Sequence, residues 1–170
     1  AVSTERLVEL MAAHHGISYL RTTRGKTPVI YGDDERFEIG GSKTVRSSNQ
    51  DRVTLVAAGI TLHEALKAYR QLNAEGIKVR VIVMYSIKPL DHGTVHRAAD
   101  ETQMVLTIED HVAEGGLGEA VLTSLSDHTT SVRTLAVRDR PRSGDSEKLL
   151  DFAGISADAI VSAVKAALPA

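Results

Sequence analysis

Three titratable side chains stand in a row in the stretch LTIEDHVAEGGLGEAV, residues 106–121. Glu109, Asp110 and His111 follow a β-like run of apolar residues. Carboxylates beside an imidazole are able to transfer protons. The stretch is therefore a candidate active site, and its alternative is an architectural turn whose charges hold neighbouring loops or a dimer.

A glycine cluster follows these side chains and leads into a predicted helix. Gly115, Gly116 and Gly118 could let backbone N–H groups approach a phosphate at the N-terminus of that helix. Glycine also permits positive φ and close packing, as a tight strand-to-helix turn needs. We favour the second interpretation and predict that residues 109–118 form a structural motif.

The densest group of cations lies near the start of the chain, in the segment Arg21-Thr22-Thr23-Arg24-Gly25-Lys26. It follows a predicted strand at residues 17–21, and the carboxyl ends of strands in an α/β sheet face the ligand crevice. Arginine suits two-point contact with a phosphate. The alternative is a basic loop that pairs with the acids at residues 33–35.

Other chemical signatures are weak or missing. His92 and His96 stand four residues apart, but we find no third ligand placed to complete a zinc site and expect a solvated helix surface. The G-x-G-x-x-G fingerprint fails because the run from Gly116 ends in Val121. No phosphate-binding P-loop and no G-x-S-x-G motif is present.

The hydrophobic pattern predicts an α/β fold. Apolar runs typical of strands buried on both faces alternate with segments of helical period, so a three-layer, doubly wound and mostly parallel sheet of about five strands is expected. The predicted strands are residues 53–58, 79–83, 104–108 and 132–137, and the predicted helices are residues 3–14, 61–76, 89–99, 118–125, 147–152 and 155–168.

We divide the chain into three parts. Residues 1–24 form a helix and a strand that cannot bury both their faces alone, and we expect them to be the end of a preceding domain. Residues 25–51 contain short β-like pieces at 29–31 and 43–45 among charged and turn residues and are interpreted as a linker. Residues 52–170 are interpreted as the main domain. Thr61 and Glu64 have the spacing of a capping box.

Composition excludes several classes of protein. Hydrophobic residues at 42% and charged residues at 25% are typical of a globular domain, and the net charge of −2 gives no electrostatic reason to expect nucleic acid. There is no cysteine, and no apolar run approaches the roughly 20 residues that span a bilayer. We expect no membrane partner and a cytoplasmic location.

Five motifs follow one another along the chain: YLRTTRGKTPVIY, VAAGITLHEAL, IKPLD, LTIEDHVAEGGLGEAV and VRDRPRSG. Their order and spacing resemble the C-terminal domain of the transketolase family, most closely its shorter, animal-like branch. The initial helix and strand then resemble the end of the family's middle, pyrimidine-binding domain. The C-terminal region of 1-deoxyxylulose-5-phosphate synthase has a comparable series and is the alternative, but the Thr-Thr pair between the arginines favours transketolase.

This resemblance implies transfer of a two-carbon ketol unit between sugar phosphates on thiamine diphosphate held by Mg²⁺. The family's cofactor site lies in other segments, so the resemblance implies no bound cofactor, no metal and no catalytic residue in this chain. Arg24 matches the family's ligand of the sugar-phosphate group, with Arg21 as a supporting candidate. The C-terminal domain then acts as a scaffold in a homodimer. A stand-alone module that binds small anions at Gly115–Gly118 remains a third possibility.

Overall fold

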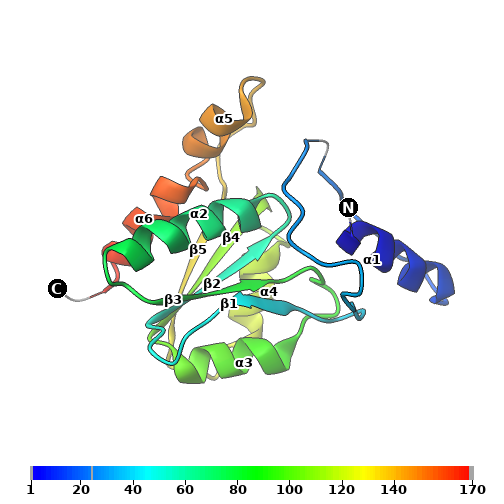
Figure 1. The fold of residues 1–170 in the computed structure, drawn as a ribbon, viewed down its shortest axis with the longest axis horizontal. Helices are drawn as coiled ribbons and strands as arrows, with labels where there is room; N and C mark the ends of the chain where they lie inside the picture. Colours follow the sequence, from blue (N-terminus) through cyan, green and yellow to red (C-terminus); the bar gives the residue numbers. More distant parts are fainter. Residues whose placement is uncertain (1, 24, 169–170) are drawn as a thin grey trace.

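The computed structural model describes residues 2–23 and 25–168. Its centre is a five-stranded sheet in the order β1-β3-β2-β4-β5, in which β1 is antiparallel to β3 and the other neighbours are parallel (Figure 1). The strands are β1 (Lys43–Arg46), β2 (Val53–Ala58), β3 (Val79–Val83), β4 (Met104–Val112) and β5 (Ser131–Val137). The predicted α/β class and mostly parallel sheet are confirmed.

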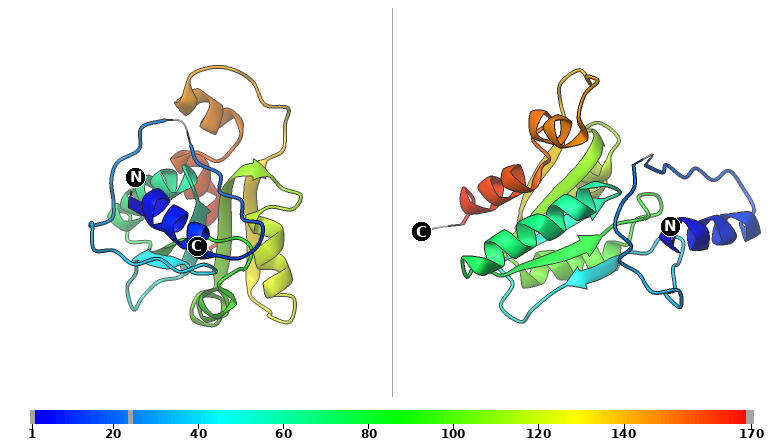
Figure 2. Two further views of the ribbon diagram at one scale, coloured as in Figure 1. Left: turned by 90° about the vertical axis from the view of Figure 1, so that its right-hand side faces the viewer. Right: turned by 45° about the horizontal axis from the view of Figure 1, so that its top comes forward.

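Helices cover both faces of the sheet, which makes three layers (Figures 1 and 2). One core is formed under α2 and α6, and the other under α3 and α4. The helices are α1 (Val2–Ala13), α2 (Thr61–Ala74), α3 (His92–Glu101), α4 (Leu117–Ser124), α5 (Ser146–Phe152) and α6 (Ala157–Lys165). Strands β2, β3 and β4 are buried on both sides, which explains why they are continuous apolar runs.

The order of the parallel strands reverses between β2 and β4. The chain leaves β2 toward β3 through α2, and then crosses back over β2 through α3 to form β4. Right-handed crossovers in opposite directions put α2 and α3 on opposite faces. In open α/β sheets the ligand crevice lies at such a switch point, outside the carboxyl ends of the strands. Here that point is flanked by Ala58 and Glu109.

The fifth strand comes from the stretch that we interpreted as a linker. Strand β1 pairs with β3 at the edge of the sheet, and Phe37 before it is 6% exposed. The Phe37 ring packs edge-on against Tyr31 and Tyr85, with ring centroids 5.1 and 5.0 Å away. Short β segments among turn residues gave a weak periodic signal, so the contribution of this stretch to the sheet was underestimated. The domain limits at 24 and 51 stay a prediction.

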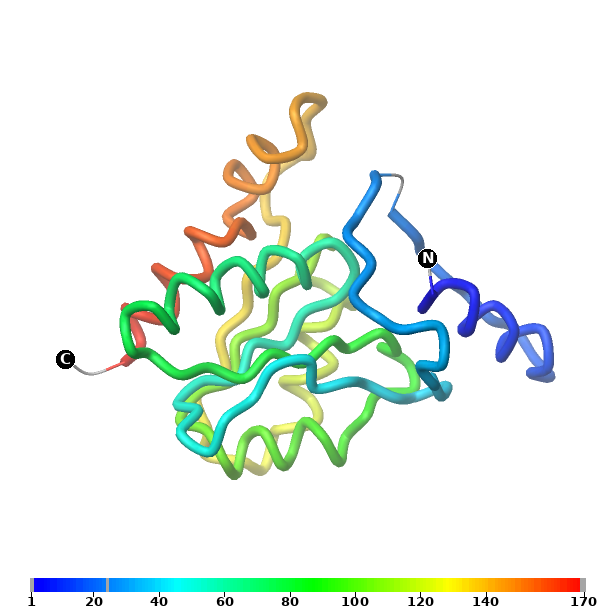
Figure 3. The backbone as a smooth tube through the Cα atoms, viewed as in Figure 1, coloured from blue at the N-terminus to red at the C-terminus, as the bar shows by residue number. Residues whose placement is uncertain are grey.

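The N-terminal part contains the predicted helix but not the predicted strand. Helix α1 has no buried residue and lies to one side of the sheet (Figure 3). Residues 17–21 are not in a strand, and Ile17 and Tyr19 are 102% and 85% exposed. A β-strand needs a partner for its backbone groups, and the described residues supply none to this segment.

The predicted capping box at the start of α2 is wrong. The N-cap of α2 is Ile60, without a side-chain cap, and the Thr61 hydroxyl instead lies 2.9 Å from the Ala58 carbonyl and 2.7 Å from that of Ile108. Glu64 accepts a hydrogen bond from the Ala157 N–H at the start of α6. The spacing was present, but tertiary partners took both side chains.

Candidate functional site

The carboxylate of Glu109 lies at the N-terminus of α4, inside the protein. The side chain is 3% exposed, and its two oxygens accept hydrogen bonds from the N–H groups of Leu117 (2.7 Å) and Gly118 (2.8 Å). These N–H groups have no partner within the helix, and the positive end of the helix dipole favours a negative charge there. The residue predicted as an acid–base candidate therefore neutralises the very site predicted to bind an anion.

The glycines make room for this carboxylate. A Cβ atom at Gly116 would overlap the carboxylate of Glu109, and one at Gly118 would lie 2.8 Å from the Cγ2 atom of Thr134. Gly115 has φ +70°, a conformation that other residues rarely adopt, and its N–H donates to Glu119. The predicted structural motif is thus a tight turn closed by Glu109.

The switch point beside this turn is closed as well. The hydroxyl of Thr61 is fully buried between the carbonyls of Ala58 and Ile108, at the ends of β2 and β4. Sequence reasoning assigned Thr61 to a helix cap because the local S/T-x-x-E spacing says nothing of the neighbouring strand. A ligand at this crevice has to bind outside Thr61 and Glu109.

Asp110 and His111 lie on the outer side of the strand end. Asp110 is half-buried and accepts two contacts from Arg21: its carbonyl oxygen lies 2.5 Å from one guanidinium nitrogen and its Oδ2 atom 3.3 Å from the other. His111 is exposed, and its Nδ1 atom lies 2.8 Å from the carbonyl oxygen of Val112. The structure therefore brings Arg21 and Asp110 together, two candidates 89 residues apart in the sequence.

The strand that was predicted before the cation cluster is absent, and of the two candidate arginines the structure describes only Arg21. Arg21 contacts Asp110 of β4, and its side chain remains 52% exposed. The expected alternative partners of Arg21, the acids at residues 33–35, are not the ones it contacts: Glu35 pairs with Lys43 at 2.5 Å. Arg24, the main phosphate-binding candidate, lies outside the described residues.

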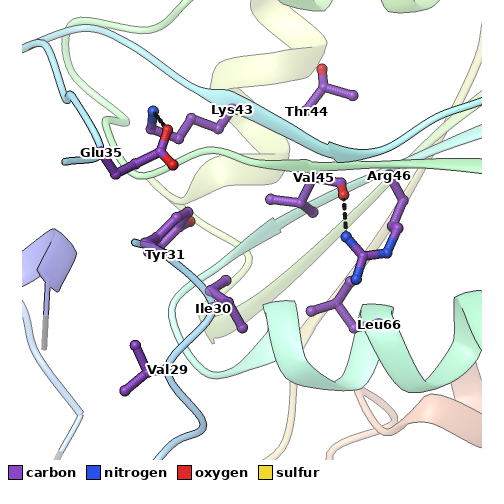
Figure 4. Close-up of a pocket in the computed structure, with 9 residues that line it drawn as sticks. All are labelled: Val29, Ile30, Tyr31, Glu35, Lys43, Thr44, Val45, Arg46 and Leu66. Atoms are coloured by element: carbon purple, nitrogen blue, oxygen red, sulfur yellow. Dashed lines mark hydrogen bonds and ion pairs between the residues drawn. The ribbon is translucent and has the colours of Figure 1, made fainter. Parts of the chain in front are cut away.

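A pocket of about 590 Å³ lies beside the edge strand β1 (Figure 4). The register of β1 against β3 shifts between Thr44 and Arg46, and a bulge of this kind turns neighbouring side chains toward one side. Arg46 lines the pocket and donates to the Val45 carbonyl at 2.6 Å. Burial, together with Glu35 and Tyr85, raises the pKa of Tyr31 to about 12, so this phenol in the pocket wall is neutral.

Three histidines gather where α3 meets the end of α4. The Nδ1 atom of His92 lies 2.8 Å from the Ser124 hydroxyl, and the Nε2 atom of His96 lies 3.0 Å from the Ser124 carbonyl oxygen. The ring of His128 packs 4.7 Å from that of His96. The expectation of a simple solvated surface missed His128, which is distant in sequence. Within residues 2–23 and 25–168, no three His, Asp or Glu side chains are arranged to hold a metal ion.

These features define a class of domain: a three-layer α/β scaffold whose switch point and adjacent helix terminus are filled by its own side chains. In agreement with this class, residues 42–160 match the family model described as "Transketolase, C-terminal domain". The chain therefore belongs to the transketolase family. In the part that the structure describes, no helix has the length and apolar character needed to cross a bilayer.

Individual relatives support this assignment. The chain is 50% identical over 167 residues to transketolase-like protein 2 of Mus musculus, and 44% identical over 166 residues to transketolase of Homo sapiens. These alignments cover 97% and 96% of this chain but only 27% of each relative. The chain thus spans about a quarter of the length of the curated relatives that it matches.

A solved structure resembles nearly the whole chain. It is described as a split gene transketolase in an inactive beta4 tetramer, and it superposes with a TM-score of 0.92 at 36% identity, over 98% of this chain and 55% of that chain. Since the superposition includes almost all of this chain, the likeness extends beyond the residues that the family model matches. The relatives named here all carry transketolase names, which favours this family over the synthase alternative.

Proposed function

We propose that this chain supplies the C-terminal domain of a thiamine-diphosphate-dependent transketolase, which transfers a two-carbon ketol unit between sugar phosphates. The observation that carries the proposal is likeness over almost the entire chain to proteins named transketolase, at 44–50% identity. The closed switch point supports a scaffold role for the domain, because Glu109 fills the N-terminus of α4 and the Thr61 hydroxyl is buried against the carbonyls of Ala58 and Ile108.

Within this function, Arg24 binds the phosphate group of the sugar, and Arg21 contributes from the same segment. A guanidinium presents its N–H donors in a planar fork that matches a phosphate, and this contact orients the substrate without acid–base chemistry. The described residues offer no set of ligands for Mg²⁺, so the proposal assigns none to them. Thiamine diphosphate, when bound by other parts of the enzyme, supplies the stabilisation of the carbanion.

The proposal includes a homodimer, to which this domain contributes contacts. The structural relative is described as an inactive beta4 tetramer. This supports the view that the domain works only when assembled with the segments that hold the cofactor. We accordingly expect the isolated chain to have no ketol-transferase activity.

The test uses the complete enzyme that contains this chain, with thiamine diphosphate, Mg²⁺, xylulose 5-phosphate as donor and ribose 5-phosphate as acceptor. Two-carbon transfer between these five-carbon sugars gives one three-carbon and one seven-carbon sugar phosphate in equal amounts. Their appearance, followed by mass spectrometry, is the expected result. Ketol transfer by the isolated chain under the same conditions would contradict the assignment of the cofactor site to other segments.

A further inference from the structure

The guanidinium group of Arg21 contacts two oxygen atoms of Asp110. One guanidinium nitrogen lies 2.5 Å from the carbonyl oxygen of Asp110 and the other lies 3.3 Å from its Oδ2 atom. A planar guanidinium can reach two acceptors at once, whereas the ammonium group of a lysine is a single point charge. The contact therefore fixes a direction as well as a distance, even though both side chains are partly exposed.

The strand pairing around Asp110 leaves its backbone free for this contact. The pairing of β2 with β4 ends at Glu109, and the register between β4 and β5 is interrupted between Ile108 and Val112. Asp110 thus lies outside both ladders, and its carbonyl oxygen is available to Arg21. The preceding residue, Glu109, is buried and held by α4, so Asp110 is attached to a rigid part of the domain.

Arg21 is the first residue of the R-T-T-R segment, residues 21–24. The last residue of this segment, Arg24, is the proposed phosphate ligand. Residues 17–19 are exposed, and residues 17–20 have no strand partner among the described residues. The contact with Asp110 therefore restricts Arg21 and the residues before it, which no strand pairing in the described part of the chain holds. We propose that Asp110 is a positioning residue, which holds Arg21 in the orientation that it needs to contribute to binding the phosphate of the substrate. This inference rests on the proposed function.

Electrostatics alone predicts the opposite effect of Asp110. Its carboxylate is a negative charge near a segment that binds a phosphate, so its removal should strengthen phosphate binding and lower KM. Removal would also release Arg21 to bind the phosphate directly. Positioning predicts that the same substitution weakens binding, because Arg21 loses one of the two acceptors that orient it. The sign of the change in KM thus separates the two roles.

The experiment measures steady-state kinetics of the complete enzyme with ribose 5-phosphate and with ribose, which lacks the phosphate. We expect Asp110→Ala to raise the KM for ribose 5-phosphate about threefold to tenfold, with a smaller change in kcat and no change in kcat/KM for ribose. Arg21→Lys should act in the same direction, because it keeps the charge but cannot reach both acceptors. In an Arg21→Ala background, Asp110→Ala should add nothing further.

Asp127→Asn is the matched control, because Asp127 is exposed and forms no side-chain hydrogen bond or ion pair with the described residues. Asp110→Leu, which is closer to aspartate in size and also lacks an acceptor, replaces Asp110→Ala if the alanine variant unfolds at a lower urea concentration. A fall in KM on Asp110→Ala, an unchanged KM, or equal effects on both sugars would overturn the inference. Failure of the proposed function is distinguishable, because the wild-type enzyme would then transfer no ketol unit to ribose 5-phosphate.

Discussion

The turn at residues 115–118 and the R-T-T-R segment at residues 21–24 both carry groups that bind anions in proteins. In the turn, two backbone N–H groups are directed at the buried carboxylate of Glu109. In the segment, Arg21 lies at the surface with 52% of its side chain exposed and contacts Asp110, which is also partly exposed. The two regions are connected through neighbouring residues of β4: Glu109 accepts hydrogen bonds from the turn, and Asp110 accepts them from Arg21.

The difference shows that an anion-binding motif can serve folding rather than ligand recognition. A glycine-rich turn before a helix creates an anion site in either case, and what matters is which anion fills it. Here the protein's own carboxylate occupies the turn, so the site has become part of the core. A phosphate that arrives from solvent needs groups that water can reach, and Arg21 has that exposure.

The largest expected effect tests how tightly the turn is closed. Gly116→Ala should lower the free energy of unfolding by about 3–5 kcal/mol, because the new Cβ displaces Glu109 from its donors and leaves a buried charge unpaired. Urea denaturation measures this. Gly115→Ala is the control: its Cβ meets nothing within 4 Å, so only the positive φ costs stability, roughly 1–2 kcal/mol. Equal costs at the two positions would contradict the closed turn.

The next effect tests the carboxylate itself. Glu109→Ala leaves the N–H groups of Leu117 and Gly118 without their acceptor and should cost about 3 kcal/mol in the same measurement. Glu119→Ala is the matched control, because the Glu119 carboxylate accepts an exposed N–H from Gly115 and its loss should cost less than about 1 kcal/mol. If the two variants were equally stable, Glu109 would not be the ligand that closes the turn.

A smaller effect is expected at an ordinary helix cap, which serves as a reference for Glu109. Asp91 begins α3 and accepts hydrogen bonds from the Thr94 N–H (3.0 Å) and the Ser42 hydroxyl (2.8 Å). Asp91→Ala should lower the free energy of unfolding by about 1 kcal/mol, as at other N-caps. A cost equal to or greater than that of Glu109→Ala would remove the distinction between the buried carboxylate and a surface cap.

The same cap has a predictable dependence on pH. Burial raises the pKa of Asp91, but the hydrogen bonds from Thr94 and Ser42 outweigh it and hold the pKa below its ordinary value. The unfolded pKa is about 3.9, so the contribution of Asp91 is complete above that pH and is lost as pH falls through the lower folded pKa. The stability difference between wild type and Asp91→Asn should therefore shrink in acid, as urea denaturation at several pH values would show.

The sequence predicts the fold where a continuous apolar run corresponds to a strand buried on both faces. Long apolar runs such as residues 53–58 and 104–108 have the same meaning wherever their partners lie, so the parallel strands were predicted. Strand β1 and the extended residues 17–21 show the limit. A short β-like run becomes a strand only if a neighbour is there to pair with it, and the sequence does not show the neighbour.

The candidate site was predictable in its residue types but not in its contacts. Glu109, Asp110 and the glycines were singled out as a motif, yet the residue types alone do not indicate that Glu109 is buried against α4 while Asp110 contacts Arg21. The useful signal was the alternation along a strand, which sends neighbouring side chains to opposite faces. Thr61 and Glu64 were misjudged and His128 was missed, because their partners are far away in the sequence.

The most direct test of the account compares arginines in the complete enzyme. Arg24→Ala should raise the KM for ribose 5-phosphate about 10- to 100-fold, as expected for the loss of charge-assisted hydrogen bonds, and leave kcat/KM for ribose unchanged. Arg46→Ala, at the edge-strand pocket, should leave both values unchanged. The assignment of phosphate binding to Arg24 would be contradicted if Arg24→Ala had no effect on the KM for ribose 5-phosphate while Gly115→Ala, in the turn, raised it.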